Sequence, residues 1–405
     1  MTGHPAVAAL RVTGFRRYLA GQLPSITCSW AQVVALSWAV VERDPHALGW
    51  LVALQFTPSL LLGPWFGAIA DRHDRRRLLM LAEAGLGLVA LCYALASAAG
   101  VLGLPLIYVL ATTWGVINAL DTPARRSLVP MLVPREAAAG ASGLSGTVLL
   151  LGMTTGSALG AALITTVGVT TTFAINAASF FADVVLLTTI RVGPSPRVRR
   201  AAGQIRAGLS YVWHRPELRS PLLVLAVIAT LGFTVQVSVP VFAHVSLHGG
   251  ASLVGAALTA VTAGSLLGAL AAAARGEPGA HAVTGAAGLM AGSLAVTAIA
   301  PNVPVALTGL AGVGFAWSSL IAFVLATLQR ADPAMTGRVM SLFAVLLLGG
   351  MAAGAPLTSA VITLAGPRAA LAFGAGATIA VISFAHGASH LSRHRFSEVL
   401  DAPGE

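Results

Sequence analysis

The sequence predicts an all-α membrane protein of twelve transmembrane helices in two pseudo-symmetric six-helix bundles. Three observations predict this fold class. Of the 405 residues, 56% are hydrophobic and only 9% charged, whereas soluble domains carry about 25% charged residues. The apolar runs are long enough to cross a bilayer, which takes about 20 mostly apolar residues per helix. The basic residues gather in the segments between these runs.

Runs of this length must form helices, because lipid offers no partner to backbone N–H and C=O groups. The spans of the first half are predicted at residues 18–41, 46–70, 78–99, 104–123, 139–164 and 168–190. Those of the second half are predicted at residues 222–246, 251–274, 282–300, 304–328, 338–364 and 368–387. The predicted domains are a first bundle at 1–192, a linker at 193–221, a second bundle at 222–390 and a tail at 391–405.

The arginines predict the orientation in the membrane. All 24 basic residues other than histidine are arginine, and a cytoplasmic N-terminus places 22 of them inside, leaving Arg43 and Arg368 outside. We therefore expect a multi-pass plasma-membrane protein with both termini in the cytoplasm. The net charge of +10 comes from these arginines, whose positions are explained by orientation in the membrane. The expected partner is therefore the lipid bilayer and not nucleic acid.

The linker contains a short helical pattern. Ile205, Leu209, Val212 and Trp213 share one helical face, which predicts an amphipathic helix lying on the inner membrane surface. The alternative is an ordinary solvated loop.

Two glycine-rich spans indicate an internal repeat. The fifth span carries Gly152, Gly156 and Gly160, and the eleventh carries Gly350 and Gly354. Glycine lets helices approach closely in lipid. Two similar halves are expected where two bundles tilt around a central site.

Polar residues form stripes along several spans. The first span carries Tyr18, Gln22, Ser25, Ser29 and Gln32 on one face. Shorter stripes are Trp114, Asn118, Asp121 and Arg125 on the fourth span, Thr230, Thr234 and Ser238 on the seventh, and Trp317 with Ser318 on the tenth. Such faces are expected to meet water or a bound solute. Hydrogen bonding between helices, worth about 0.6 kcal/mol per contact, is the open alternative.

A few ionisable residues fall inside predicted spans, where they have a functional role by default. Asp121 lies near the inner end of the fourth span and can pair with Arg125 or Arg72. Glu83 and Asp183, in the third and sixth spans, are the candidates for carrying a proton. An interhelical role for Asp183 is an equally good interpretation.

The segment after the second span carries a loop motif. From Gly67 to Arg77 it reads Gly-Ala-Ile-Ala-Asp-Arg-His-Asp-Arg-Arg-Arg. This resembles the G-x-x-x-D-R-x-G-R-R motif of the major facilitator superfamily, with Asp74 in place of the second glycine. The resemblance implies the major facilitator fold and a gate on the cytoplasmic side. The implied gating residues are Gly67, Asp71, Arg72, Arg75, Arg76, Asp121, Arg125 and Arg338.

Further segments resemble the enterobactin-exporter-like branch of this superfamily. They are Phe15–Arg17, Gly21–Gln22, Asn118–Pro134, Asn176–Phe180, Gly208–Trp213 and Gly337–Leu342. The resemblance, from about residue 14 to residue 385, implies a transporter that exports a small amphipathic molecule in exchange for protons. It also implies that spans one, four, seven and ten line the pathway. The expected substrate-binding residues are Gln22, Ser25, Ser29, Gln32, Trp114, Asn118, Thr234 and Trp317.

The antiporter motif of the fifth span is only partly present, because Ser157 replaces its proline. The competing interpretations are an importer of a small solute, a transporter-like receptor and a membrane enzyme. The sequence contains no cluster of metal ligands, nucleophile elbow or phosphate loop, so we expect no enzyme activity, metal or cofactor. The protein is expected to act as a monomer.

Overall fold

The computed structural model describes residues 5–190, 204–232, 235–276, 279 and 281–400. The first half contains the short helix α1 (Pro5–Leu10) and six long helices. These are α2 (Thr13–Val41), α3 (Leu48–Arg72), α4 (Arg75–Ala98), α5 (Leu104–Leu128), α6 (Ala138–Thr166) and α7 (Gly168–Thr188). Each has an apolar stretch long enough to cross a membrane.

The second half begins with α8 (Gln204–Trp213) and then supplies the other six spans. The seventh span is built from α9 (Pro216–Val227), the π-helical turn η4 (Ile228–Gly232), α10 (Val235–Val241) and a second π-helical turn, η5 (Phe242–Ser246). The remaining spans are α11 (Ala251–Arg275), α12 (Ala282–Ile299), α13 (Val303–Leu328), α14 (Pro333–Ala365) and α15 (Pro367–Leu400). The described chain thus contains the twelve predicted spans.

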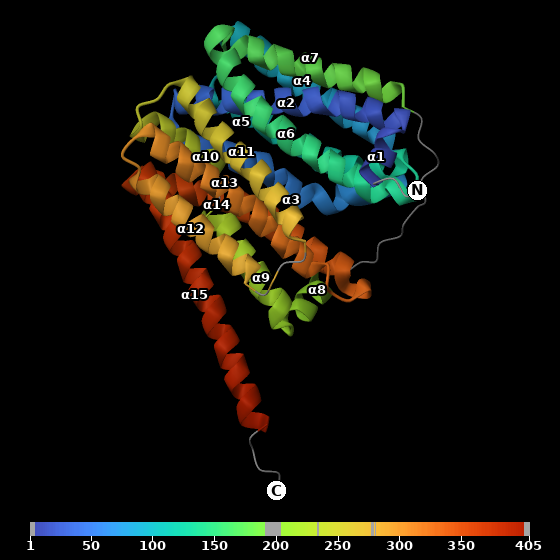
Figure 1. Ribbon diagram of the computed structural model, residues 1–405. Helices are drawn as coiled ribbons and strands as arrows, with labels where there is room; N and C mark the ends of the chain where they lie inside the picture. Colours follow the sequence, from blue (N-terminus) through green and yellow to red (C-terminus); the bar gives the residue numbers. More distant parts are fainter. Residues whose placement is uncertain (1–4, 191–203, 233–234, 277–278, 280, 401–405) are drawn as a thin grey trace.

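The two halves have the same internal packing. In the first half, span one (α2) packs on spans five and six, span two on span four, and span three on spans four and six. Each pairing recurs six spans later in the second half, where for example α11 packs on α13 and α12 packs on α15. Figure 1 shows the first-half helices, blue to green, beside the second-half helices, yellow to red. Two pseudo-symmetric six-helix bundles are confirmed.

Glycines make this repeated packing possible. A Cβ on Gly156 of span five would collide with the Thr27 carbonyl of span one. At the equivalent place, a Cβ on Gly354 of span eleven would collide with the Thr230 carbonyl of span seven. The glycine-rich fifth and eleventh spans therefore each pack against the first helix of their own bundle. Close backbone approach compensates for the absence of a hydrophobic driving force between helices in lipid.

The halves meet along two pairs of helices, α3 with α14 and α6 with α11. We call the end that holds the turn at residues 73–74 the arginine-rich end, and the end that holds residues 42–47 the opposite end. At the opposite end the Gly49 amide donates to Ser359 Oγ at 3.1 Å, and His46 Nδ1 lies 2.9 Å from Thr363 Oγ1. These contacts join the second span to the eleventh.

Apolar and aromatic contacts complete the junction at the opposite end. The Trp38 and His244 rings meet edge to face with centroids 5.4 Å apart. A Cβ on Gly255 of α11 would collide with Ala161 of α6. Val237 and Ala355 of the second half belong to the same buried cluster as Leu36 of the first. The halves are therefore sealed against each other at the opposite end.

The structure differs from the sequence prediction at two elements. The helix α15 continues to Leu400 instead of ending near residue 387, because no proline interrupts the chain between Pro367 and Pro403. The seventh span begins at Pro216 and contains π-helical turns. The helix predicted in the linker is present as α8, which packs on α14 and buries Val212 while Leu209 and Trp213 are exposed; its place at the inner membrane surface stays a prediction. Residues 191–203 lie outside the described part of the chain.

Candidate functional site

The ionisable residues predicted inside the first half come together around one guanidinium. Arg125 of α5 donates to Asp121, one turn earlier, through two bonds of 3.1 Å. It also donates to Glu83 of α4, 42 residues away in sequence. Charge-assisted contacts of this kind are about twice as strong as neutral hydrogen bonds. The guanidinium therefore ties the third span to the fourth.

Two further side chains complete what we call the Arg125 cluster: Tyr18, Glu83, Asp121, Arg125 and Asp183. Asp183 of α7 and Tyr18 of α2 both interact electrostatically with Arg125. The cluster lies among helices of a single half, and the side chains of Tyr18, Glu83 and Asp183 are almost fully buried. Its position is toward the arginine-rich end, because Arg125 is three residues from the end of α5.

Asp183 has an unusual environment. Its carboxyl lies against Gly21 of α2, where any larger residue would overlap it. Neither of its oxygens has a hydrogen-bond partner within the described part of the protein. An isolated carboxylate in an apolar interior is strongly unfavourable. The cluster also holds three carboxyls against one guanidinium, which leaves an excess of negative charge when all three are ionised.

The polar stripe of the first span bonds to the other helices of its own half. Ser145 of α6 donates to Gln22 at 3.1 Å, and Ser25 donates to Glu83 at 3.4 Å. Farther along, the side chain of Asn176 in α7 holds two more members of the stripe. It donates to Gln32 at 2.9 Å and accepts from Ser29 at 3.4 Å. These bonds correspond to the alternative interpretation of the stripe, hydrogen bonding between helices.

The other expected substrate contacts have a different setting. Trp114 and Asn118 of α5 are partly exposed. Trp114 packs on a buried cluster from α4 and α7 that includes Leu86 and Phe180. Trp317 of α13 is also partly exposed and packs on the core of the second half. Thr234 lies outside the described residues.

The loop motif has structural roles at the arginine-rich end. Arg76 donates to the carbonyls of Leu187 and Thr188 at 2.7 and 2.6 Å, so it satisfies the last turn of α7. Asp74 accepts from the Arg76 and Arg77 amides and is the N-cap of α4. Aspartate is a favoured N-cap, which explains its presence where the motif has glycine.

The other residues expected at the gate are less closely associated. Gly67 is buried in α3, whereas Arg72 is exposed at the end of that helix. Arg75 donates to Met131 Sδ at 2.9 Å, and Arg338 donates to Met335 Sδ at 3.3 Å. The side chain of Asp71 lies outside what the structure describes, although its backbone belongs to α3.

Sequence reasoning missed four residues that build this site. Tyr18 was placed in the stripe but not in the cluster, and Ser145, Asn176 and Gly21 were not singled out as site residues. Asn176 and Gly21 lie in two of the segments that resemble the exporter branch. Their contacts, Asn176 with Gln32 and Gly21 with Asp183, give a physical reason for those segments.

Comparison with known proteins agrees with this architecture. Residues 4–398 match the family described as "transmembrane secretion effector". The staphyloferrin A transporter of Staphylococcus aureus is 25% identical over 244 residues, which span 59% of this chain and 62% of that transporter. The enterobactin exporter EntS of Citrobacter koseri is 28% identical over 324 residues, 76% of each chain.

One solved structure extends the likeness to the fold. The nucleoside transporter NupG superposes with a TM-score of 0.73, covering 93% of this chain and 98% of that one, at 9% sequence identity. A likeness at this identity concerns the fold alone. It places the twelve helices in the major facilitator fold that the loop motif implied.

Proposed function

Since the chain belongs to the transmembrane secretion effector family of major facilitator transporters, we propose that it exports a small amphipathic molecule by proton-coupled antiport. The coupling is supported by the buried carboxyl of Asp183, which lies in the Arg125 cluster and has no hydrogen-bond partner within the described part of the protein. The direction of transport is supported by the likeness to a protein named as an enterobactin exporter.

The arginine-rich end is proposed to face the cytoplasm, with both chain termini on that side. The positive-inside rule supports this orientation. The contacts at the opposite end, such as that between Gly49 and Ser359, then close the outer side. The structure corresponds in this proposal to the inward-facing state, in which the substrate enters from the cytoplasm.

We assign substrate binding to spans one, four, seven and ten, which the resemblance to the superfamily implies line the pathway. Trp114 and Asn118, both partly exposed on α5, are the proposed contacts from the first half, and Trp317 is proposed from the second. Aromatic and amide side chains suit a bulky, mostly uncharged molecule. Gln22 and Gln32 of the α2 stripe are hydrogen-bonded to other helices of the first half. We propose that these bonds keep α2 in position beside the binding site.

Protonation is proposed to control the conformational exchange. With a proton, the Asp183 carboxyl is neutral and the cluster carries less excess negative charge. Loss of the proton makes burial of this carboxyl against Gly21 unfavourable, so α7 and α2 are pushed toward another arrangement. A proton taken up from outside and released inside would then drive the return step after substrate export.

The loop at the arginine-rich end is proposed to act as the inner gate. Asp71, with the arginines of the motif, would bridge to the second half when the inner side closes. The N-terminus of a helix is a suitable partner for its carboxylate. Asp121 and Arg125 would transmit the protonation state of the cluster to this loop along α5.

We expect Asp183→Asn to uncouple transport from the proton gradient. Asparagine keeps the size of the side chain but cannot exchange a proton, so the variant should bind and exchange substrate while losing net export driven by a pH gradient. The measurement uses inside-out vesicles and a compound found in an accumulation screen of expressing cells. Gradient-driven uptake should fall at least tenfold, whereas exchange without a gradient should continue.

The matched control is Asp44→Asn, at the opposite end. Asp44 is an N-cap that accepts from the His46 amide at 2.9 Å, and asparagine caps helices equally well. This variant should transport normally. If Asp183→Asn retained full gradient-driven uptake, the assignment of Asp183 to proton coupling would be wrong.

A further inference from the structure

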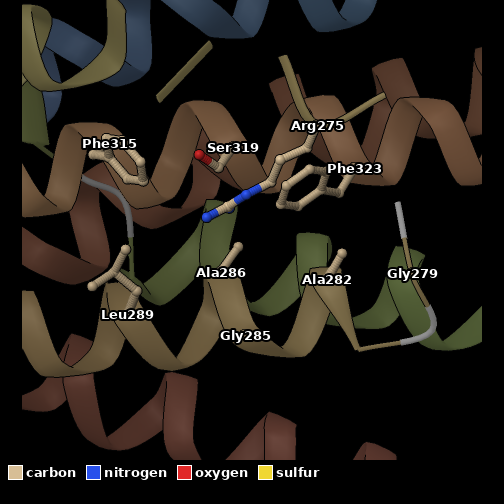
Figure 2. A pocket seen from close by; sticks show the side chains of 9 residues that line it. All are labelled: Arg275, Gly279, Ala282, Gly285, Ala286, Leu289, Phe315, Ser319 and Phe323. Atoms are coloured by element: carbon tan, nitrogen blue, oxygen red, sulfur yellow. The ribbon is translucent and has the colours of Figure 1, made fainter. Parts of the chain in front are cut away.

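A groove lies between α11 and α12 at the arginine-rich end. Both helices pack on α13, which forms the floor of the groove with Phe315, Ser319 and Phe323. The wall on α12 is made of small residues, among them Ala282 and Gly285. The volume is about 260 Å³. Figure 2 shows the residues of α13 and those of α12 facing each other across the groove.

The groove opens toward the lipid-facing surface of the second half. Leu289 lines the groove and is 45% exposed, and it continues a stripe of exposed apolar residues along α12 with Val296 and Ile299. Gly285, one turn from Leu289, is exposed as well. Since α12 is a transmembrane helix, such a stripe faces acyl chains. The groove is therefore open toward the side of α12 that faces acyl chains.

One cation reaches into this apolar groove. The Arg275 side chain, from the last turn of α11, extends across it between α13 and α12 (Figure 2). Within the described part of the chain, Arg275 has neither an ion pair nor a side-chain hydrogen bond. Arg275 is exposed at the mouth of the groove, and an arginine without an acidic partner beside an apolar surface favours an anionic ligand, because guanidinium binds phosphate in a bidentate manner.

We propose that this groove binds an anionic phospholipid of the cytoplasmic leaflet. The headgroup phosphate sits on the Arg275 guanidinium, and part of one acyl chain lies along Ala286, Leu289 and Phe315. Basic pockets between transmembrane helices on the cytoplasmic side are suited to such lipids. The assignment to the cytoplasmic leaflet rests on the orientation proposed above. The lipid site itself, an arginine beside an apolar groove, does not depend on which substrate is transported.

The dimensions favour a lipid over the transported molecule. Sites for drug-sized ligands have volumes of about 300–1,000 Å³ and enclose most of the ligand. This groove is smaller and open along one side. A single acyl chain needs only a narrow apolar surface, because the rest of the lipid stays in the bilayer.

The test measures lipid binding by the purified full-length protein in detergent. Native mass spectrometry and thermal unfolding are followed while phosphatidylglycerol or phosphatidylcholine is added. We expect phosphatidylglycerol to bind more tightly and to raise the melting temperature more. Arg275→Gln should weaken phosphatidylglycerol binding about tenfold, the loss of one charge-assisted contact. Phosphatidylcholine binding should weaken less, because its choline group already offsets the phosphate charge, so the preference between the two lipids should shrink.

A second variant tests the acyl-chain part of the groove. A side chain added at Gly285 meets open space, so Gly285→Leu should fold normally and fill the groove. It should abolish the preference for phosphatidylglycerol. The control is Gly292→Leu, on the same helix seven residues farther along, where an added side chain also meets open space outside the groove. Arg135→Gln, at an exposed loop arginine, controls for the loss of one positive charge.

Three outcomes would overturn the proposal. The first is equal binding of the two lipids by the unmodified protein. The second is an unchanged preference in Arg275→Gln or Gly285→Leu. The third is equal stabilisation by inorganic phosphate or glycerol phosphate, which would mean that a free anion occupies the site. Because the readout is lipid binding, its failure leaves the proposed export activity untouched.

Discussion

Replacing Arg125 with glutamine is expected to destabilise the first bundle by about 3–5 kcal/mol and to abolish transport. The reason is that Arg125 is the only cation of its cluster. Without it, Glu83 and Asp121 remain buried with no opposite charge, and breaking a buried ion pair from one side costs about this much. The measurement is the yield of folded, monodisperse protein together with its melting temperature in detergent.

A second substitution separates this cause from a general loss of packing. The double variant Arg125→Gln/Glu83→Gln also lacks the carboxylate of Glu83, the most deeply buried of the uncompensated charges. Its melting temperature should therefore lie between those of Arg125→Gln and the unmodified protein. Arg126→Gln, at the exposed neighbouring arginine, should have little effect. A single Arg125→Gln variant as stable as the unmodified protein would show that the cluster is not held by charge pairing.

Replacing Gly49 with valine is expected to open the opposite end of the protein. In the structure a Cβ at this position would lie 2.6 Å from the Ala355 carbonyl and would overlap Ser359. Overpacking costs about 1–3 kcal/mol. A penalty of this size, applied only to the state with the opposite end closed, shifts the population ratio about 5- to 150-fold.

The distance between spin labels on the two halves measures this shift. Val101 and Ile299 are exposed, by 64% and 77%, at the opposite end of the first and second halves. After replacement of Cys28 and Cys92, labels at these positions should move farther apart in Gly49→Val. Gly63→Val is the matched control on the same helix, because a Cβ at Gly63 meets open space. An unchanged distribution in Gly49→Val would mean that this contact is not part of a gate.

The sequence predicted the spans well because the relevant signals are local. Apolar length and arginine position identify each helix without knowledge of its neighbours. The Asp121–Arg125 pair was also predictable, since residues four apart lie on the same side of a helix. The π-helical turns around Thr230 and Phe242 had no comparable signal, and the length of α15 depends on the absence of a breaker beyond the apolar run.

The partners of the polar residues could not be predicted from periodicity. The spacing of Gln22, Ser25 and Gln32 shows that they share a face, but not which helix that face meets. Their partners Ser145, Glu83 and Asn176 lie on α6, α4 and α7. Likewise, Glu83 and Arg125 are 42 residues apart, and Asp183 meets Gly21 only through packing of the sixth span on the first.

Proton movement coupled to substrate movement is the most direct test of the proposed antiport. Purified protein is reconstituted into vesicles with an acidic interior and a pH-sensitive dye, and compounds that expressing cells exclude are added outside. We expect an exported compound to accumulate inside the vesicles while protons leave, and the Asp183→Asn protein to move no protons. Accumulation of the compound at the same rate with no proton efflux, or after the gradient has been collapsed, would contradict the proposed antiport.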